Sequence, residues 1–103
     1  MYLARFSYDV LPRDREQAIG FIRREVAAAL ERGLRARLLI PLTRASGDGA
    51  LQFELELSGL DELERFRERG VGNGEETAAW MRSFSEILVT PPAVEILRVE
   101  EAA

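Results

Sequence analysis

The stretch from residue 34 to residue 57 constrains the fold most, because it predicts two antiparallel strands joined by a polar turn. Apolar residues take every second position in both halves, and Gln52, Glu54 and Glu56 stand between those of the second half. This alternation is typical of strands that bury one face. Residues 43–49 are rich in Gly, Ser and Asp, so we expect a hairpin loop there. The apolar positions are Leu34, Ala36, Leu38, Ile40 and Leu42 in the first strand and Leu51, Phe53, Leu55 and Leu57 in the second.

The segments on either side of the hairpin predict two more strands and two helical regions. Pro41 has no N–H to donate to a sheet, so its strand is expected at an edge or with a bulge. The expected elements are a strand over 2–10, a helix over 14–32 ended by Gly33, the hairpin strands 34–42 and 51–57, a helical region from Ser58 to Pro91 that is interrupted near 70–74, and a strand over 93–100.

The resulting order is βαββαβ, which predicts one α+β domain over residues 1–103 with a ferredoxin-like fold. In this fold a four-stranded antiparallel sheet has the strand order 4-1-3-2, with both helices on one face. The order places the strand that contains Pro41 at an edge. An α+β domain of different connectivity is the alternative. The first helix is expected to face the sheet with Ile19, Ile22, Val26, Ala29 and Leu30.

The residue inventory excludes several kinds of chemistry. The chain has no His and no Cys, and all 14 of its basic residues are Arg. It therefore has no imidazole base, no thiol nucleophile, no Schiff-base or P-loop lysine, and no His or Cys ligand for a metal. The sequence also has neither an EF-hand loop nor a tight cluster of Asp residues. We therefore expect no metal and no cofactor.

Charge and hydropathy argue against two kinds of partner. The net charge is −4 and nearly every Arg has an acidic neighbour, which disfavours binding to nucleic acid. No apolar run approaches the roughly 18 residues of a membrane span. The N-terminal residues alternate like a strand and do not resemble a signal peptide. We therefore expect a cytoplasmic protein that binds neither nucleic acid nor a membrane.

If the helices cover one face of the sheet, the other face carries a mixture of apolar, acidic and basic residues. Arg and Glu on neighbouring strands are placed to pair across the sheet. Two interpretations remain open: a solvated face with exposed ion pairs, or a face on which two copies of the chain meet. The residues expected on this dimer face are Leu3, Arg5, Arg37, Leu39, Glu54 and Glu56.

In length and element order the whole chain resembles the dimeric α/β-barrel superfamily, in which two ferredoxin-like sheets pack face to face. The resemblance implies a homodimer and a pocket between sheet and helices. In the cofactor-free monooxygenases and haem-degrading members, an Asn, a Trp and often a His serve that pocket. This chain has Asn73 and Trp80 in the corresponding region but no His, so haem degradation is disfavoured. Small lactone isomerases belong to the same superfamily.

The candidate pocket residues each have a structural interpretation as well. Trp80 lies on an apolar helical stripe, which is typical of core packing. Asn73 stands between two glycines, which is typical of a helix cap or a turn. The residues proposed to line a ligand pocket are Tyr8, Asn73, Trp80, Arg82 and Phe84.

Three hypotheses about function follow. The first is a small homodimeric ferredoxin-like protein that at most binds a small organic ligand between sheet and helices. The second is a cofactor-independent monooxygenase or isomerase of the dimeric α/β-barrel type. The third is a regulatory or RNA-binding module on an open sheet, which the lack of aromatic residues on the free face disfavours. An apolar cavity lined by Tyr8, Trp80 and Phe84 and open to solvent would favour the second hypothesis over the first.

Overall fold

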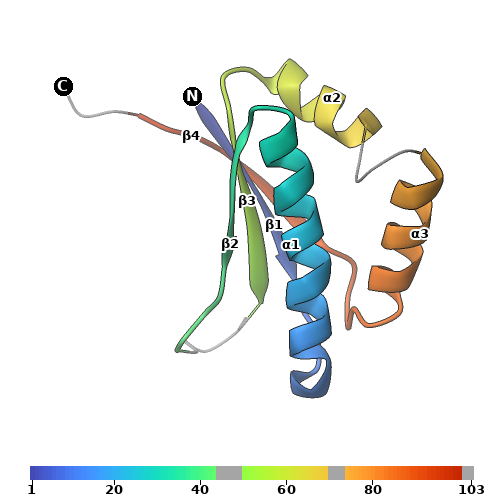
Figure 1. Cartoon of the computed structure of the whole chain (residues 1–103). Helices are drawn as coiled ribbons and strands as arrows, with labels where there is room; N and C mark the ends of the chain where they lie inside the picture. The colour runs from blue at the N-terminus through green and yellow to red at the C-terminus, as the bar shows by residue number, and fades with distance from the viewer. Residues whose placement is uncertain (44–49, 70–73, 101–103) are drawn as a thin grey trace.

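The computed structural model describes residues 1–43, 50–69 and 74–100, and Figure 1 shows the arrangement of their helices and strands. The hairpin loop expected over 43–49 lies outside the described residues except for Thr43. The elements in chain order are β1 (Tyr2–Tyr8), the short 3₁₀ helix η1 (Pro12–Asp14), α1 (Arg15–Glu31), β2 (Arg35–Leu39), β3 (Leu51–Leu57), α2 (Leu60–Arg69), α3 (Gly74–Ser85) and β4 (Ala93–Arg98).

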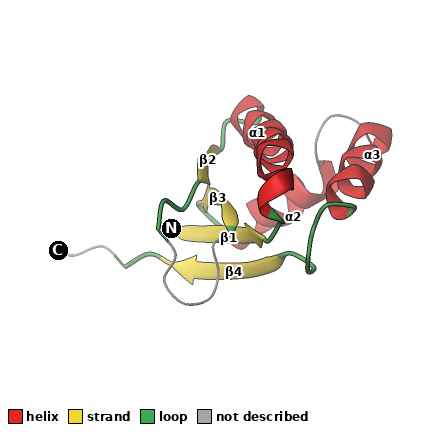
Figure 2. Cartoon of the chain, turned by 90° about the horizontal axis from the view of Figure 1, so that it is seen from below, coloured by secondary structure: helices red, strands yellow, loops and turns green. Residues whose placement is uncertain are grey.

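The four strands form one antiparallel sheet in the order β2-β3-β1-β4, with the helices on one side of it (Figure 2). This confirms the predicted ferredoxin-like topology and the edge position of the first hairpin strand. That strand is shorter than predicted, because β2 ends at Leu39 and Pro41 follows it. Arg15 donates a hydrogen bond of 3.0 Å from its guanidinium to the carbonyl oxygen of Pro41. The proline therefore lies outside the sheet and leaves its hydrogen bonding intact.

The register between β1 and β3 gives the sheet two faces of different chemistry. Residues directly opposite each other on paired strands point to the same side of a sheet. Phe6 lies opposite Phe53 on the side of the helices, and their ring centroids are 5.6 Å apart. Arg5 lies opposite Glu54 on the other side. Apart from the half-buried Tyr2, the helix-facing residues of both central strands are buried, as the alternation predicts: Ala4, Phe6, Tyr8, Leu51, Phe53, Leu55 and Leu57.

Three of the five residues predicted to face the sheet from helix α1 are buried, namely Ile19, Ile22 and Ala29. The other two are not. Val26 is only half-buried, and Leu30 is 56% exposed. The buried face is centred on smaller residues, because alanines allow the helix axis to approach the sheet closely and leave the larger Leu30 at the rim. The helix ends as predicted at Gly33, whose φ of 76° suits a glycine. The buried residues of α1 are Ala18, Ile19, Ile22, Glu25, Ala28 and Ala29.

The second helical region is divided as predicted, with α2 ending at Arg69 and α3 beginning at Gly74. Glu62 receives hydrogen bonds at the start of α2 from the Ser58 N–H at 2.5 Å and the Gly59 N–H at 3.3 Å. These bonds satisfy N–H groups that a helix start leaves without partners.

The register between β1 and β4 shows which residues of the last strand face the helices. Val94 lies opposite Phe6 and Ile96 opposite Ala4, so both point to the side of the helices. They are nevertheless 41% and 47% exposed, because the helices do not cover this edge of the sheet. Leu97 lies opposite Leu3 on the other face.

Candidate functional site

A half-open, mostly apolar pocket of about 430 Å³ lies between α3 and the sheet. Every element around it contributes at least one side chain. The pocket residues are Phe6 and Tyr8 of β1, Glu25 of α1, Phe66 and Arg67 of α2, Thr77, Trp80, Met81, Phe84 and Ser85 of α3, Leu88 and Pro92 of the following loop, and Val94 of β4.

Aromatic rings form one wall of the pocket, and Phe84 contacts several of them. Its ring centroid is 4.7 Å from that of Tyr8, 4.9 Å from that of Phe21 and 5.6 Å from that of Trp80. The indole N–H of Trp80 donates a hydrogen bond of 3.0 Å to the carbonyl oxygen of Phe21. This bond ties α3 to α1 and satisfies the only polar atom of the indole.

Glu25 and Tyr8 form a buried hydrogen-bonded pair in this apolar surrounding. The Tyr8 hydroxyl donates to the Glu25 carboxylate, at 2.9 Å from one oxygen and 3.2 Å from the other. Glu25 is 6% exposed and Tyr8 4%. The carboxylate is therefore almost inaccessible to water, and among the described residues the Tyr8 hydroxyl is its hydrogen-bond donor.

Burial raises the pKa of Glu25 from 4.5 to about 7, and the hydrogen bond from Tyr8 offsets this only in part. The pKa of Tyr8 is raised well above its usual range, first by burial and then by the nearby charge of Glu25. Tyr8 therefore stays a hydroxyl donor at neutral pH. Glu25, in contrast, exchanges its proton close to neutrality, and carboxyl groups tuned in this way are typical of acid–base sites.

The structure brings three of the five predicted pocket residues together. Tyr8, Trp80 and Phe84 all line the pocket. Arg82 lies on α3 but is exposed and does not line the pocket. Asn73 lies outside the described residues.

Glu25 lines the pocket but is not among the pocket residues predicted from the sequence, although its position in the sequence of α1 gives a signal for it. Ala18, Ile22, Glu25 and Ala29 follow one another at intervals of four, three and four residues. Residues at this spacing lie on one face of a helix, so the Glu occupies the middle of an otherwise apolar stripe. A charged residue in that position indicates a buried polar site.

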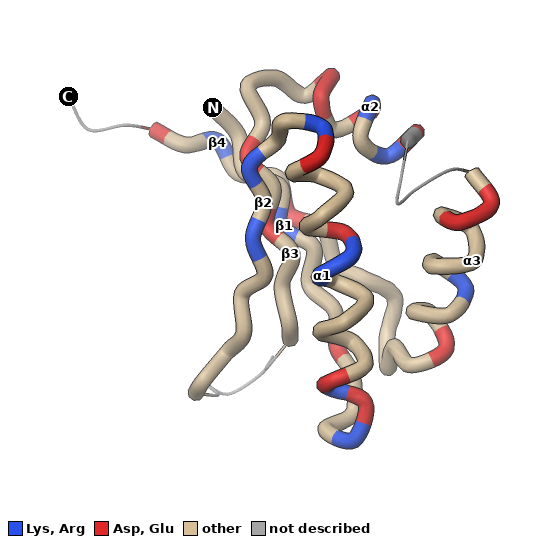
Figure 3. The backbone as a smooth tube through the Cα atoms, viewed as in Figure 1, with Lys and Arg blue, Asp and Glu red and all other residues tan. Residues whose placement is uncertain are grey.

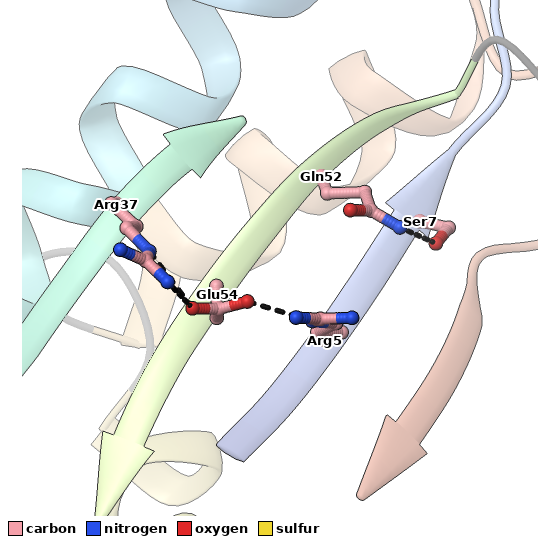
Figure 4. A network of polar contacts seen from close by, with 5 residues as sticks. All are labelled: Arg5, Ser7, Arg37, Gln52 and Glu54. Carbon is pink, nitrogen blue, oxygen red and sulfur yellow. Dashed lines mark hydrogen bonds and ion pairs between the residues drawn. The ribbon is translucent and has the colours of Figure 1, made fainter. Parts of the chain in front are cut away.

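The opposite face of the sheet carries all six residues predicted for a dimer face, with Glu54 at the centre. Glu54 is only 2% exposed and accepts hydrogen bonds from the Nε atoms of Arg5 at 2.7 Å and Arg37 at 2.8 Å (Figure 4). Burial alone would raise the pKa of Glu54, but the two guanidinium groups outweigh it and hold the pKa below its usual value. Next to them, Gln52 donates a hydrogen bond of 3.2 Å to the Ser7 hydroxyl.

The described part of the chain offers no other obvious binding chemistry. Acidic and basic positions are intermixed along the helices and do not gather into a basic patch (Figure 3). Within residues 1–43, 50–69 and 74–100, no group of three or more acidic side chains is placed to hold a metal ion. In these same ranges, no helix is both long and apolar enough to cross a membrane.

Comparison with known proteins identifies the fold. No protein-family model matches the sequence, and no curated protein matches it. A putative antibiotic biosynthesis monooxygenase from Nitrosomonas europaea has a similar structure, with a TM-score of 0.72 and 12% identity over 96% of this chain and 98% of that chain. A protein from Mycobacterium tuberculosis has a TM-score of 0.68 and 16% identity over 100% of this chain and 99% of that chain.

A dimeric ferredoxin-like protein of unknown function from Thermobifida fusca is also similar, with a TM-score of 0.63 and 16% identity over 96% of this chain and 92% of that chain. These sequence identities are low, so the likeness establishes the fold and not an activity. It confirms the predicted ferredoxin-like fold.

Replacing Glu25 by Gln should stabilise the folded protein above neutral pH. A carboxyl group with a pKa of 4.5 in the unfolded chain and about 7 in the fold contributes stability below pH 4.5 that is lost as the pH rises to about 7. Gln has no charge to bury and keeps an oxygen for the Tyr8 hydroxyl. The free energy of unfolding of Glu25→Gln should therefore exceed that of the wild type by roughly 3 kcal/mol above about pH 7.

Urea unfolding at about pH 4 and about pH 8 measures this difference, which should be small at the lower pH. The matched control is Glu31→Gln, because Glu31 lies exposed on the same helix. A Glu25→Gln variant that follows the wild-type stability at both pH values would show that Glu25 is not a buried charge.

Proposed function

We propose that this protein binds a small aromatic organic molecule in the pocket between α3 and the sheet, and that it does so as a homodimer. The observation that carries the proposal is the pocket itself, with its wall of aromatic rings in tilted and edge-to-face contact and its buried Tyr8–Glu25 pair. Its volume of about 430 Å³ falls in the usual range for small-molecule sites.

The shape and chemistry of the pocket favour a flat ligand. The rings of Phe84, Tyr8 and Trp80 are held by contacts with one another, so they form a wall that changes little when a ligand binds. Aromatic pairs gain from stacked and edge-to-face contacts beyond the burial of apolar surface. A planar aromatic ligand makes such contacts with several of these rings at once.

A bulky side chain at Val94 should block the pocket. Val94 lines the pocket, is 41% exposed and has room to be replaced without disturbing the core. We expect Val94→Trp to weaken binding of naphthalene, used as an apolar probe, at least tenfold, as measured by fluorescence titration. Ile96→Trp is the matched control, since Ile96 is the next helix-facing residue of β4 but does not line the pocket. Equal loss of binding in both variants, or no binding by the wild type, would contradict the proposal.

The homodimer is proposed to form through the sheet face that the helices leave uncovered. On this face Leu3 lies opposite Leu97, while Leu39 lies opposite Gln52 at the edge strand. Glu54 already has both of its oxygens paired with arginines. A second sheet can therefore cover it without leaving a buried carboxylate unpaired, which is the main cost of burying charge. The dimeric state of the similar protein from Thermobifida fusca supports this proposal.

A charge placed on the uncovered face should separate the two subunits. Leu39→Arg adds a positive charge beside Arg37 with no further acidic partner provided for it, and its desolvation in a dimer is unfavourable. Light scattering behind a sizing column should give a mass of two chains for the wild type and of one chain for this variant. Leu30→Arg is the control, because Leu30 is 56% exposed on the helix side, and it should stay dimeric. A monomeric wild type would remove this part of the proposal.

A cofactor-independent monooxygenase or isomerase is the second candidate. It is favoured by the meeting of Tyr8, Trp80 and Phe84 at a half-open apolar pocket that also holds an ionisable group. The structural similarity to a putative antibiotic biosynthesis monooxygenase from Nitrosomonas europaea supports the same candidate. Oxygen uptake in the presence of a hydroquinone separates an oxygenase from a binding protein, with Val94→Trp as the blank.

The cytoplasmic location expected from the sequence stays a prediction.

A further inference from the structure

Binding of an apolar aromatic molecule does not by itself explain why the pocket contains the carboxylate of Glu25. It is the only acidic side chain among the described residues of the pocket. A carboxylate has about four acceptor positions, and the Tyr8 hydroxyl supplies one proton to them. Because Glu25 lines the pocket, its remaining acceptor positions can take a donor from a molecule bound there. An apolar ligand alone would leave that capacity unused and the charge desolvated.

The groups around Glu25 do not neutralise its charge. Tyr8 faces it from β1 and stays protonated. Arg67 of α2 lines the pocket but is exposed, and burial and the Tyr8 bond account for the shifted pKa of Glu25 without it. The pocket residues contributed by α3 and by β4 are all neutral. A donor that enters the pocket therefore meets a carboxylate whose charge is not shared with a cation.

We infer that Glu25 is the proton acceptor of the pocket and that its ligand is a weakly acidic aromatic alcohol, of the class of phenols and naphthols. The inference rests on the proposed function, because it needs an aromatic molecule in the same pocket. In the complex the ligand hydroxyl donates a hydrogen bond to a carboxylate oxygen of Glu25, beside the hydrogen bond that the Tyr8 hydroxyl already donates.

The proton transfer that this geometry permits needs no further reactant. The ligand O–H bond breaks, a new O–H bond forms on Glu25, and the electron pair stays on the ligand oxygen as a phenolate. The Tyr8 hydroxyl then has the phenolate as a stronger acceptor than the neutral carboxyl group. Burial raises the pKa of Glu25 to about 7. At neutral pH the side chain is therefore partly ionised, and its carboxylate is basic enough to accept a proton.

Two other ligand classes fit the pocket less well. A carboxylic acid is an anion at neutral pH, and its charge would be repelled by that of Glu25 in a site with little water. An aromatic hydrocarbon has no proton to donate, so it gains from the rings but not from the carboxylate. The weakly acidic alcohol has both the ring and a neutral donor.

Naphthol and naphthalene form a matched pair of probes for this inference, because they differ only in the hydroxyl group. We expect the wild type to bind naphthol about tenfold more tightly than naphthalene at about pH 8, because one hydrogen bond to a charged group strengthens binding by about this factor. The preference should shrink as the pH falls through about 7, because Glu25 becomes neutral. In Glu25→Gln it should be small and independent of pH, while naphthalene still binds.

The control Glu31→Gln, exposed on the same helix, should behave as the wild type at every pH. If naphthalene binds but naphthol binds no better, or if Glu25→Gln keeps the full preference, the role of Glu25 is overturned and the aromatic pocket stands. If neither probe binds the wild type, the proposed function fails and the inference fails with it.

Discussion

The register between β1 and β3 is the constraint on which both candidate sites depend. It places Phe6 with Phe53 under the helices and Arg5 with Glu54 on the opposite face. A shift of β3 by one residue against β1 would turn Glu54 toward the core and Phe53 toward solvent. The cost of that exchange fixes the sheet, and with it the place of Tyr8 at the end of β1.

The pocket carries a feature that lowers stability. Glu25 occupies the buried face of α1 where an apolar residue would pack without loss of hydration. A single hydroxyl, that of Tyr8, is the partner that keeps this carboxylate in place. Glu54 is equally buried but has two guanidinium groups, so its charge is stabilised by the fold. The contrast between the two glutamates fits a functional role for Glu25 and a structural role for Glu54, because functional sites often sacrifice stability.

Much of the fold was predictable from the sequence, because period-two alternation in residues 51–57 and the turn residues around them fix strands directly. The edge position of β2 was predicted correctly from the fold topology and from Pro41, but the proline lies beyond the end of the strand, so its missing N–H does not set that edge. The site was predictable only in part. Tyr8, Trp80 and Phe84 are large aromatic residues on predicted apolar faces, so their meeting could be anticipated.

Glu25 could not be placed without the rotation of α1 about its axis. The predicted stripe and the buried face of that helix share Ile22 and Ala29. The prediction extended the stripe to the more hydrophobic Val26 and Leu30, whereas close packing on the sheet buries alanines of the adjoining face instead. Arg82, in contrast, lies two positions from both Trp80 and Phe84, so helical spacing places it on the opposite side of α3, away from the pocket.

The most direct test of the account is the titration of the Glu25 side-chain carboxyl by carbon-13 NMR, with Glu25→Gln used to assign its signal. The account predicts a midpoint near 7, because the carboxylate lies in an apolar pocket with Tyr8 as its partner. It also predicts that a saturating phenolic ligand changes this midpoint. A midpoint at the ordinary value of 4.5 would contradict the account, since it would show a solvated carboxylate and no proton acceptor poised for neutral pH.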